Sequence, residues 1–99
     1  MREFNGRVAV VTGAASGIGL ALAERFAEEG MRIVMADVES DRLDVEAERL
    51  RAAGRDVTAV VCDVADAASV DALADAAWDA YGQVHILCTN AGVLSGGFT

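Results

Sequence analysis

The chain has 99 residues, of which 54% are hydrophobic and 24% charged, with a formal net charge of −8. This composition is typical of one globular domain rather than of a disordered segment. The acidic excess would repel a phosphate backbone, so nucleic acid is excluded as an expected partner. No apolar run reaches the roughly 18 residues that a membrane span needs, and the start lacks a signal-peptide pattern. We therefore expect a cytoplasmic protein without membrane contact.

Four short apolar runs rich in β-branched residues predict strands at residues 7–11, 32–36, 57–61 and 84–89. Short continuous runs of this kind indicate a parallel sheet whose strands are buried on both faces. Three segments with helical period lie between them, and each has one apolar stripe that should face the sheet. The stripes are Ile18, Leu22 and Phe26; then Leu43, Ala47 and Leu50; then Val70, Leu73, Ala77 and Tyr81, flanked by Trp78.

The residues at the ends of these segments agree with this assignment. Gly30, Gly54 and Gly82 each follow a helical segment, where glycine tolerates the left-handed conformation of the turn. Asp66 is a suitable N-cap for the third helix. The order β-α-β-α-β-α-β with right-handed crossovers predicts an α/β fold that forms half of a doubly wound parallel sheet. We expect residues 1–99 to be one half of a single domain.

The stretch TGAASGIG, residues 12–19, lies between the first strand and the first helix. Glycines allow a sharp turn there and let a phosphate approach the unpaired N–H groups of the helix start. The pattern predicts an anion site, with a dinucleotide pyrophosphate as the favoured ligand. A purely structural turn is the alternative. A P-loop is excluded because Gly19 is followed by Leu20, whereas an S-adenosylmethionine-dependent methyltransferase remains open.

Asp37 ends the second strand, 18 residues beyond Gly19. An acid at this place can accept hydrogen bonds from the adenosine ribose, and its charge would repel a 2′-phosphate. Val38 follows it, so no arginine stands next to it, and NAD is favoured over NADP. Two alternatives stay open: Asp37 could cap the next helix, and Arg42 could turn back towards a 2′-phosphate.

These residues resemble the classical short-chain dehydrogenase/reductase family. TGAASGIG is similar to its cofactor loop T-G-x-x-x-G-[IL]-G, CDV at 62–64 to the end of its third strand, and TNAG at 89–92 to its N-N-A-G, with Thr89 in place of the first Asn. The resemblance covers essentially the whole chain in order and spacing. It implies a Rossmann-type doubly wound parallel sheet, truncated to about four strands in the order 3-2-1-4, with three helices.

The resemblance also implies a role for each matching residue in binding the cofactor. Gly13, Gly17 and Gly19 would shape the pyrophosphate loop, which Ser16 and Ile18 would line; Asp37 would hold the ribose; Asp63 and Val64 would bracket the adenine; and Asn90, Ala91 and Gly92 would touch the cofactor. Strands one and four would be neighbours where the strand order reverses, which is where ligands bind in such sheets.

Cysteine and histidine usage predicts neither a metal site nor a disulfide. Cys62 and Cys88 form no C-x-x-C motif, and His85 has no companion at ligand spacing. In the order 3-2-1-4 the strands that carry the cysteines are about 14 Å apart, which is too far for a disulfide. We therefore expect two free thiols.

In the family that this chain resembles, the catalytic residues are a Ser and a Tyr-x-x-x-Lys downstream of N-A-G. The sequence to Thr99 contains no lysine, and its one tyrosine, Tyr81, belongs to an apolar stripe. Ser95 follows Asn90 too closely to be the catalytic serine. We expect no catalytic residue in these 99 residues, whereas the parent enzyme would transfer hydride between NAD and a secondary alcohol or ketone.

The fourth strand would lie at an edge of this sheet although its sequence is apolar. Such an edge invites pairing with another chain, so we expect the isolated chain to self-associate or to be marginally stable, and the protein to be a homo-oligomer. The other hypotheses for the chain as given are a non-catalytic nucleotide-binding or interaction module and a methyltransferase-like domain.

Overall fold

Four parallel strands alternate with three helices along residues 6–88, the part of the chain that the computed structural model describes. In chain order they are β1 (Val8–Thr12), α1 (Gly17–Glu28), β2 (Arg32–Asp37), α2 (Ser40–Ala52), β3 (Val57–Val61), α3 (Ala67–Tyr81) and β4 (Ile86–Cys88). The sheet order is β3-β2-β1-β4. The predicted fold class and strand order are thus confirmed, and the fourth strand is shorter than the apolar run that predicted it.

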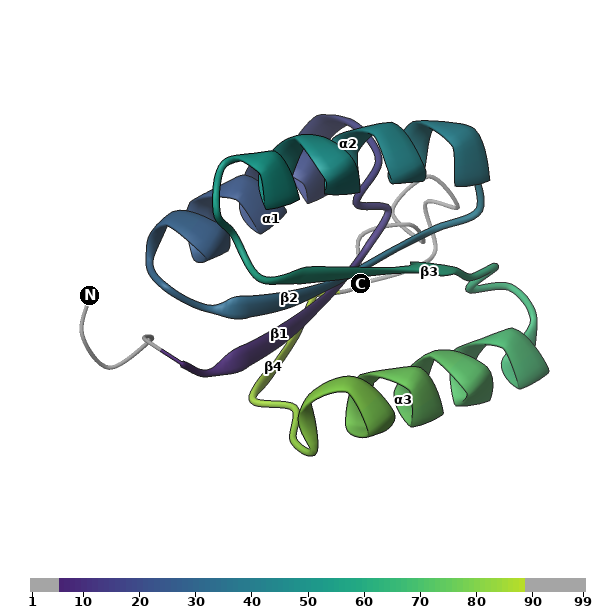
Figure 1. The fold of residues 1–99 in the computed structure, drawn as a ribbon. Helices are drawn as coiled ribbons and strands as arrows, with labels where there is room; N and C mark the ends of the chain where they lie inside the picture. Colours follow the sequence, from purple (N-terminus) through teal and green to yellow (C-terminus); the bar gives the residue numbers. More distant parts are fainter. Residues whose placement is uncertain (1–5, 89–99) are drawn as a thin grey trace.

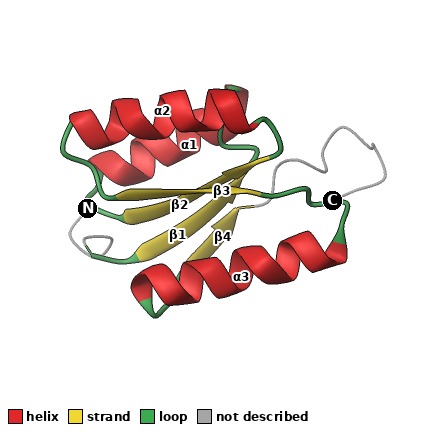
Figure 2. Ribbon diagram, turned by 45° about the vertical axis from the view of Figure 1, so that its right-hand side comes forward, coloured by secondary structure: helices red, strands yellow, loops and turns green. Residues whose placement is uncertain are grey.

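The helices cover both faces of the sheet (Figure 1). Helices α1 and α2 lie side by side on one face, and α3 lies alone on the other. The same three layers are visible after rotation of the molecule (Figure 2). Parallel sheets occur almost only with both faces covered, because the crossover helices pack there. This arrangement explains why β1 and β2, at the centre of the sheet, are continuous apolar runs.

The strand register brings the carboxyl ends of the strands to one edge of the sheet. Thr12 of β1 is paired with Ala36 of β2, and Val11 is paired with Cys88 of β4. Asp37 is paired with Val61 of β3. The strand order reverses between β1 and β4, which is the switch point where open α/β sheets bind ligands. The loop that follows β1 therefore lies beside this point.

Two apolar clusters, one on each face, form the core. The larger lies under α1 and α2 and includes Ile33, Met35 and Leu43, all fully buried. The smaller lies under α3 and includes Val34 and Leu73. The predicted stripe of α2, Leu43, Ala47 and Leu50, is buried as expected. A central sheet with an apolar layer on each side is therefore the main source of stability.

The predicted stripe of α1 is wrong at Ile18, whose exposed fraction is 72%. The residues that α1 buries are Gly19, Ala23 and Ala27, while Leu22 and Phe26 pack against the cluster from the side. These three small residues share one face of the helix, so its backbone comes close to the sheet. Ile18 lies in the first turn, beyond that face, and remains at the surface.

The prediction that the strands are buried on both faces is confirmed for β1 and β2, but it is wrong for β3 and β4. Val61 and Leu87 are 57% and 61% exposed, and Val70 of the predicted α3 stripe is 40% exposed. Both strands are at edges of the described sheet. On the face that α3 covers, an apolar groove of about 220 Å³ remains open, and Val70, Leu73, Val84 and Leu87 are among the residues that line it. Val61 does not line this groove.

The local end signals are confirmed. The Asp66 side chain accepts a hydrogen bond from the Ala68 N–H at 3.1 Å, as an N-cap does. Gly30, Gly54 and Gly82 have φ values of 88°, 86° and 73°, so each has the left-handed conformation that glycine favours. No helix within residues 6–88 has the length and apolar character needed to cross a membrane. Both cysteines are free, as expected.

Candidate functional site

The loop between β1 and α1 makes a tight turn at the carboxyl edge of the sheet. Gly13 and Gly17 have φ values of 65° and 59°, a conformation that costs other residues free energy. Ala14 and Ala15 between them are fully buried. The Ala14 N–H donates to the Ala36 carbonyl at 3.0 Å. The loop is therefore anchored to the end of β2 and turns directly into α1.

The start of α1 is open to an anion. Ser16 is the N-cap residue, yet its side chain makes no capping hydrogen bond, and the first turn contains no acidic residue. A Cβ built on Gly17 would meet no atom within 4 Å, so there is free space over the loop. Unpaired N–H groups and the positive end of the helix dipole attract a phosphate at such a position. The residues present thus fit the pyrophosphate of a dinucleotide.

Asp37 is almost buried, with 8% of its surface exposed. Its Oδ2 accepts a hydrogen bond from the Ala15 N–H at 3.0 Å, and its Oδ1 accepts one from the Glu39 N–H at 3.0 Å. Glu39 is the N-cap residue of α2. Asp37 therefore steadies the start of α2 and braces the glycine loop. A carboxylate has about four lone-pair sites, so two protein donors leave capacity for ribose hydroxyls.

Arg42, in the first turn of α2, also contacts the glycine loop. Its Nε donates to the Ala15 carbonyl at 3.1 Å. Ala15 is thus held at its N–H by Asp37 and at its carbonyl by Arg42. The sequence suggested Arg42 only as a possible partner of a 2′-phosphate, and the contact with Ala15 was missed, because no periodicity relates positions 27 residues apart.

The segment after β3 lies next to Asp37. The Cys62 N–H donates to the Asp37 carbonyl at 3.0 Å. Asp63 is exposed, and its Oδ1 accepts from the Ala65 N–H at 2.9 Å. Val64 is half-buried against the apolar cluster under α3. The structure thus brings the predicted adenine residues to the same edge as the ribose residue.

Another residue that sequence reasoning missed is Ser69, whose Oγ accepts a hydrogen bond from the Asp63 N–H at 2.9 Å. This contact ties the segment after β3 to the first turn of α3. A serine near a helix start is common, so its residue type alone did not single it out.

The end of β4 lies beside the start of the glycine loop. The Thr12 hydroxyl donates to the Cys88 carbonyl at 3.3 Å. The remaining predicted cofactor residues, Asn90, Ala91 and Gly92, lie outside the described residues, so their predicted role stays a prediction. Cys88 is two residues before Asn90.

Tyr81 lies at the rim of the core, as expected, and near the amino end of β3 rather than at the candidate site. Its hydroxyl donates to Asp56 Oδ1 at 2.9 Å and shares a hydrogen bond of 3.1 Å with Thr58 Oγ1. Burial raises the pKa of Tyr81 above its ordinary value. The Arg32 guanidinium lies 5.8 Å from the ring centre. This network connects α3 to the starts of β2 and β3.

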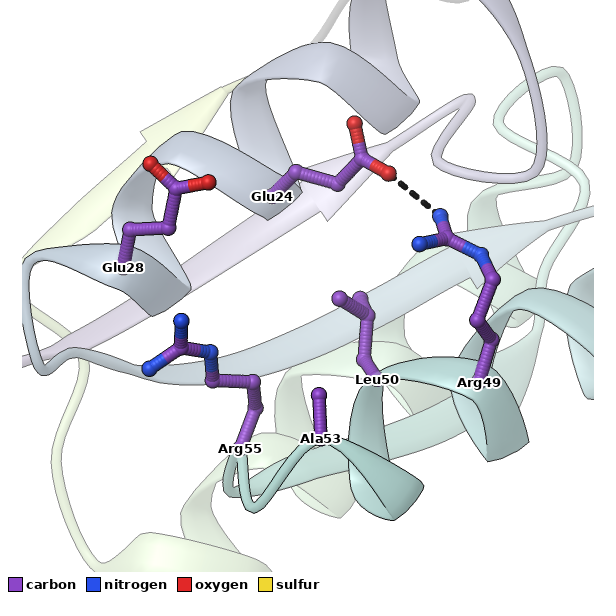
Figure 3. Close-up of a pocket in the computed structure, with 6 residues that line it drawn as sticks. All are labelled: Glu24, Glu28, Arg49, Leu50, Ala53 and Arg55. Atoms are coloured by element: carbon purple, nitrogen blue, oxygen red, sulfur yellow. Dashed lines mark hydrogen bonds and ion pairs between the residues drawn. The ribbon is translucent and has the colours of Figure 1, made fainter.

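A polar hollow of about 230 Å³ lies between the carboxyl-terminal parts of α1 and α2, away from the glycine loop (Figure 3). Glu24 and Glu28 of α1 lie across it from Arg49 and Arg55, and Glu24 forms an ion pair with Arg49. Exposed pairs of this kind contribute little to stability. The described residues contain no group of three or more His, Cys, Asp or Glu side chains that could hold a metal ion.

A parallel α/β sheet with a glycine-rich strand-to-helix loop at its switch point and an acid after the second strand defines a Rossmann-type fold. The family model described as short chain dehydrogenase matches residues 7–99. The chain belongs to this family.

Individual relatives agree with this assignment. The chain is 56% identical over 88 residues to the 1-deoxy-11-beta-hydroxypentalenate dehydrogenase of Streptomyces exfoliatus, covering 89% of this chain and 32% of that protein. A short-chain dehydrogenase/reductase of Burkholderia phymatum, solved in complex with NAD, superposes with a TM-score of 0.85 at 53% identity, over 88% of this chain and 31% of that chain. An F189W actinorhodin polyketide ketoreductase solved with NADPH gives 0.83 at 37% identity, over 91% and 34%. The chain thus spans about a third of their length.

Proposed function

We propose that this chain binds the adenosine and pyrophosphate part of a nicotinamide dinucleotide, as the N-terminal half of the Rossmann domain of a short-chain dehydrogenase. The observation that carries the proposal is the glycine loop at the start of α1, which Asp37 braces at the switch point of the sheet. Relatives of known structure hold NAD or NADPH. Neither the non-catalytic module nor the methyltransferase-like domain is favoured by any described contact.

Each predicted residue receives a role in this proposal. The N–H groups at the start of α1 bind the pyrophosphate, with Gly13, Gly17 and Gly19 allowing its approach and Ser16 and Ile18 at the rim. Asp37 accepts hydrogen bonds from the ribose. Asp63 and Val64 bracket the adenine, and Asn90, Ala91 and Gly92, which follow β4 in the sequence, contact the cofactor.

The bound dinucleotide supplies a nicotinamide ring that accepts or donates a hydride. The residues of this chain bind and orient the cofactor, and none is assigned to a proton-transfer role. In the whole enzyme, we propose hydride transfer between NAD and a small-molecule secondary alcohol or ketone. The 99 residues contain no lysine, so the Tyr-x-x-x-Lys motif of the family is not among them.

NAD is the proposed cofactor rather than NADP. The buried carboxylate of Asp37 would lie close to the ribose and would repel a 2′-phosphate. Arg42, the basic residue that could attract this phosphate, donates its Nε to the Ala15 carbonyl and is thereby held against the glycine loop. The relative that is 53% identical was solved with NAD, and the one that is 37% identical was solved with NADPH. The direct test is therefore to compare the binding of NAD and NADP to this protein.

The test is calorimetric titration of the full-length protein with NAD, NADP and S-adenosylmethionine. We expect NAD to bind at least about tenfold more tightly than NADP, and S-adenosylmethionine not to bind. Tighter binding of NADP would refute the role of Asp37 as a discriminator. Binding of S-adenosylmethionine alone would refute the proposed function.

We also propose that the protein self-associates. β4 is an edge strand of the described sheet, and its Leu87 is 61% exposed. An apolar edge is a template for pairing with a second copy, so the proposal and its test concern the 99-residue chain taken alone. Light scattering coupled to size-exclusion chromatography should give a mass above that of a monomer, and a monomer at all concentrations would refute this proposal.

A further inference from the structure

We propose that Arg42 is a positioning residue for the glycine loop. By holding the Ala15 carbonyl, it orients the following peptide group so that the Ser16 N–H is presented to the pyrophosphate. The inference rests on the proposed function, and it names a residue outside the cofactor loop that sets the affinity of the site.

The first step is the double attachment of Ala15. Its N–H donates to Asp37 Oδ2 at 3.0 Å, and its carbonyl accepts from Arg42 Nε at 3.1 Å. Asp37 and Arg42 are 22 and 27 residues away in sequence, at the end of β2 and in the first turn of α2. The side chain of Ala15 is fully buried. The residue is therefore held on both sides of its backbone.

The second step is the geometry of the peptide between Ala15 and Ser16. In a trans peptide the carbonyl and the following N–H point in opposite directions, and the described residues contain no cis peptide bond. Holding the Ala15 carbonyl against Arg42 therefore turns the Ser16 N–H away from that side chain. Among the described residues the Ser16 N–H donates to no backbone carbonyl, and Ser16 is the N-cap residue of α1, a position where N–H groups can bind an anion.

The third step is that, among the described residues, Arg42 alone donates to the Ala15 carbonyl, and no second hydrogen bond replaces this contact. Gly13 and Gly17 flank this short segment and have positive φ values, and glycine permits other backbone conformations at little cost. Asp37 holds the N–H of Ala15 but not the peptide that follows it. Without the guanidinium, that peptide can rotate, and the Ser16 N–H is then no longer fixed towards the ligand.

The chain offers a matched control in the same helix. Arg51, in the last turn of α2, donates its Nε to the Val57 carbonyl, also at 3.1 Å. Arg42→Met and Arg51→Met each remove one charge and one hydrogen bond from an arginine to a backbone carbonyl. Arg51→Met also removes an exposed ion pair with Glu48, and such pairs contribute little to stability. Only Arg42→Met removes a contact with the loop.

The experiment compares both variants with the wild type in the full-length protein. Binding of NAD is measured by calorimetry, and deuterium uptake of loop residues 13–17 is measured without cofactor. We expect Arg42→Met to raise the Kd for NAD about three- to tenfold, as for the loss of one hydrogen bond, and to speed exchange in the loop. Arg51→Met should do neither, although both variants should lose similar thermal stability.

Arg42→Lys separates position from charge, because lysine keeps the charge and has one donor group without the planar guanidinium. Recovery of both loop protection and NAD affinity supports positioning. Recovery of affinity without loop protection would overturn it, as would unchanged binding by Arg42→Met or equal weakening by Arg51→Met. If the wild type fails to bind NAD, the proposed function fails, while the exchange data still decide whether Arg42 orders the loop.

Discussion

The Asp37 carboxylate accepts a hydrogen bond from the Ala15 backbone N–H at 3.0 Å, although 22 residues separate them in the chain. The side chain of Asp37, at the end of β2, therefore helps to hold the glycine loop in place. The same carboxylate accepts from the Glu39 N–H at the start of α2. A change at Asp37 should consequently alter two properties, the choice of cofactor and the stability of the loop.

Asp37→Asn removes the negative charge and retains one oxygen that can still accept from Ala15. We expect the ratio of NADP to NAD affinity to rise about tenfold, equivalent to about 1.4 kcal/mol, because the repulsion of a 2′-phosphate is lost. The variant should also lose about 1 kcal/mol of stability, since the amide nitrogen cannot accept from Glu39. Calorimetry with both cofactors and urea denaturation measure these effects.

Asp44→Asn is the control for charge alone, because Asp44 is exposed on α2. It should leave the affinity ratio and the stability unchanged. An Asp37→Asn variant with the wild-type ratio would show that another group discriminates between the cofactors.

Gly17→Ala tests the open space above the loop. Its φ of 59° should cost the alanine variant about 1–2 kcal/mol of stability. Its new Cβ would enter the space where a Cβ meets no protein atom within 4 Å, which is the proposed place of the pyrophosphate. We therefore expect NAD binding to weaken by more than about tenfold, since the phosphate must move away from the N–H groups.

Gly54→Ala is the matched control. Gly54 follows α2 with a φ of 86°, and its Cβ would also meet no atom within 4 Å. This variant should lose similar stability and bind NAD like the wild type. Equal loss of binding in both variants would attribute the effect to general destabilisation rather than to the site.

The sequence predicts the central part of this fold better than its edges. β1 and β2 are buried on both faces, so their composition reports their environment directly. The Asp66 cap and the glycines after the helices also follow from local chemistry. The exposure of Val61 and Leu87 depends instead on which elements cover β3 and β4, and the apolar character of these strands does not contain that information.

For the candidate site, too, features that depend on neighbouring residues could be predicted, whereas contacts between distant residues could not. The glycine loop and Asp37 could be identified from residue type and spacing. The contacts that Asp37 and Arg42 make with Ala15 could not be identified in this way, because they depend on how β2 and α2 pack against the loop. Ile18 was misplaced because the inward face of α1 is made of glycine and alanine, which a stripe of large apolar residues does not reveal.

Leu43→Ala tests the larger core cluster. Leu43 is fully buried under α2, so its truncation should cost about 2–5 kcal/mol of unfolding free energy through lost burial and a residual cavity. Val45→Ala, at a position 65% exposed on the same helix, should change stability by less than about 0.5 kcal/mol. Urea denaturation of both variants provides the comparison. Similar losses in the two variants would contradict the assigned inward face of α2.

Because of Tyr81, we expect the stability of the fold to depend on pH in the alkaline range. Burial raises the pKa of its hydroxyl, mainly by desolvation, while the hydrogen bond from Thr58 acts in the opposite direction. The folded state therefore favours the neutral phenol. Its contribution to stability is complete below the ordinary pKa of about 10 and is lost as the pH rises through the higher pKa of the folded state.

Tyr81→Phe removes this titration and the hydrogen bonds to Asp56 and Thr58. At about pH 8, well below the ordinary tyrosine pKa, we expect the variant to be less stable than the wild type by about 1 kcal/mol. The difference should shrink above about pH 10 because only the wild type must keep a phenol neutral in the folded state. Urea denaturation across this range measures both curves. Parallel curves at alkaline pH would show that the Tyr81 hydroxyl has the same pKa in the folded and unfolded states.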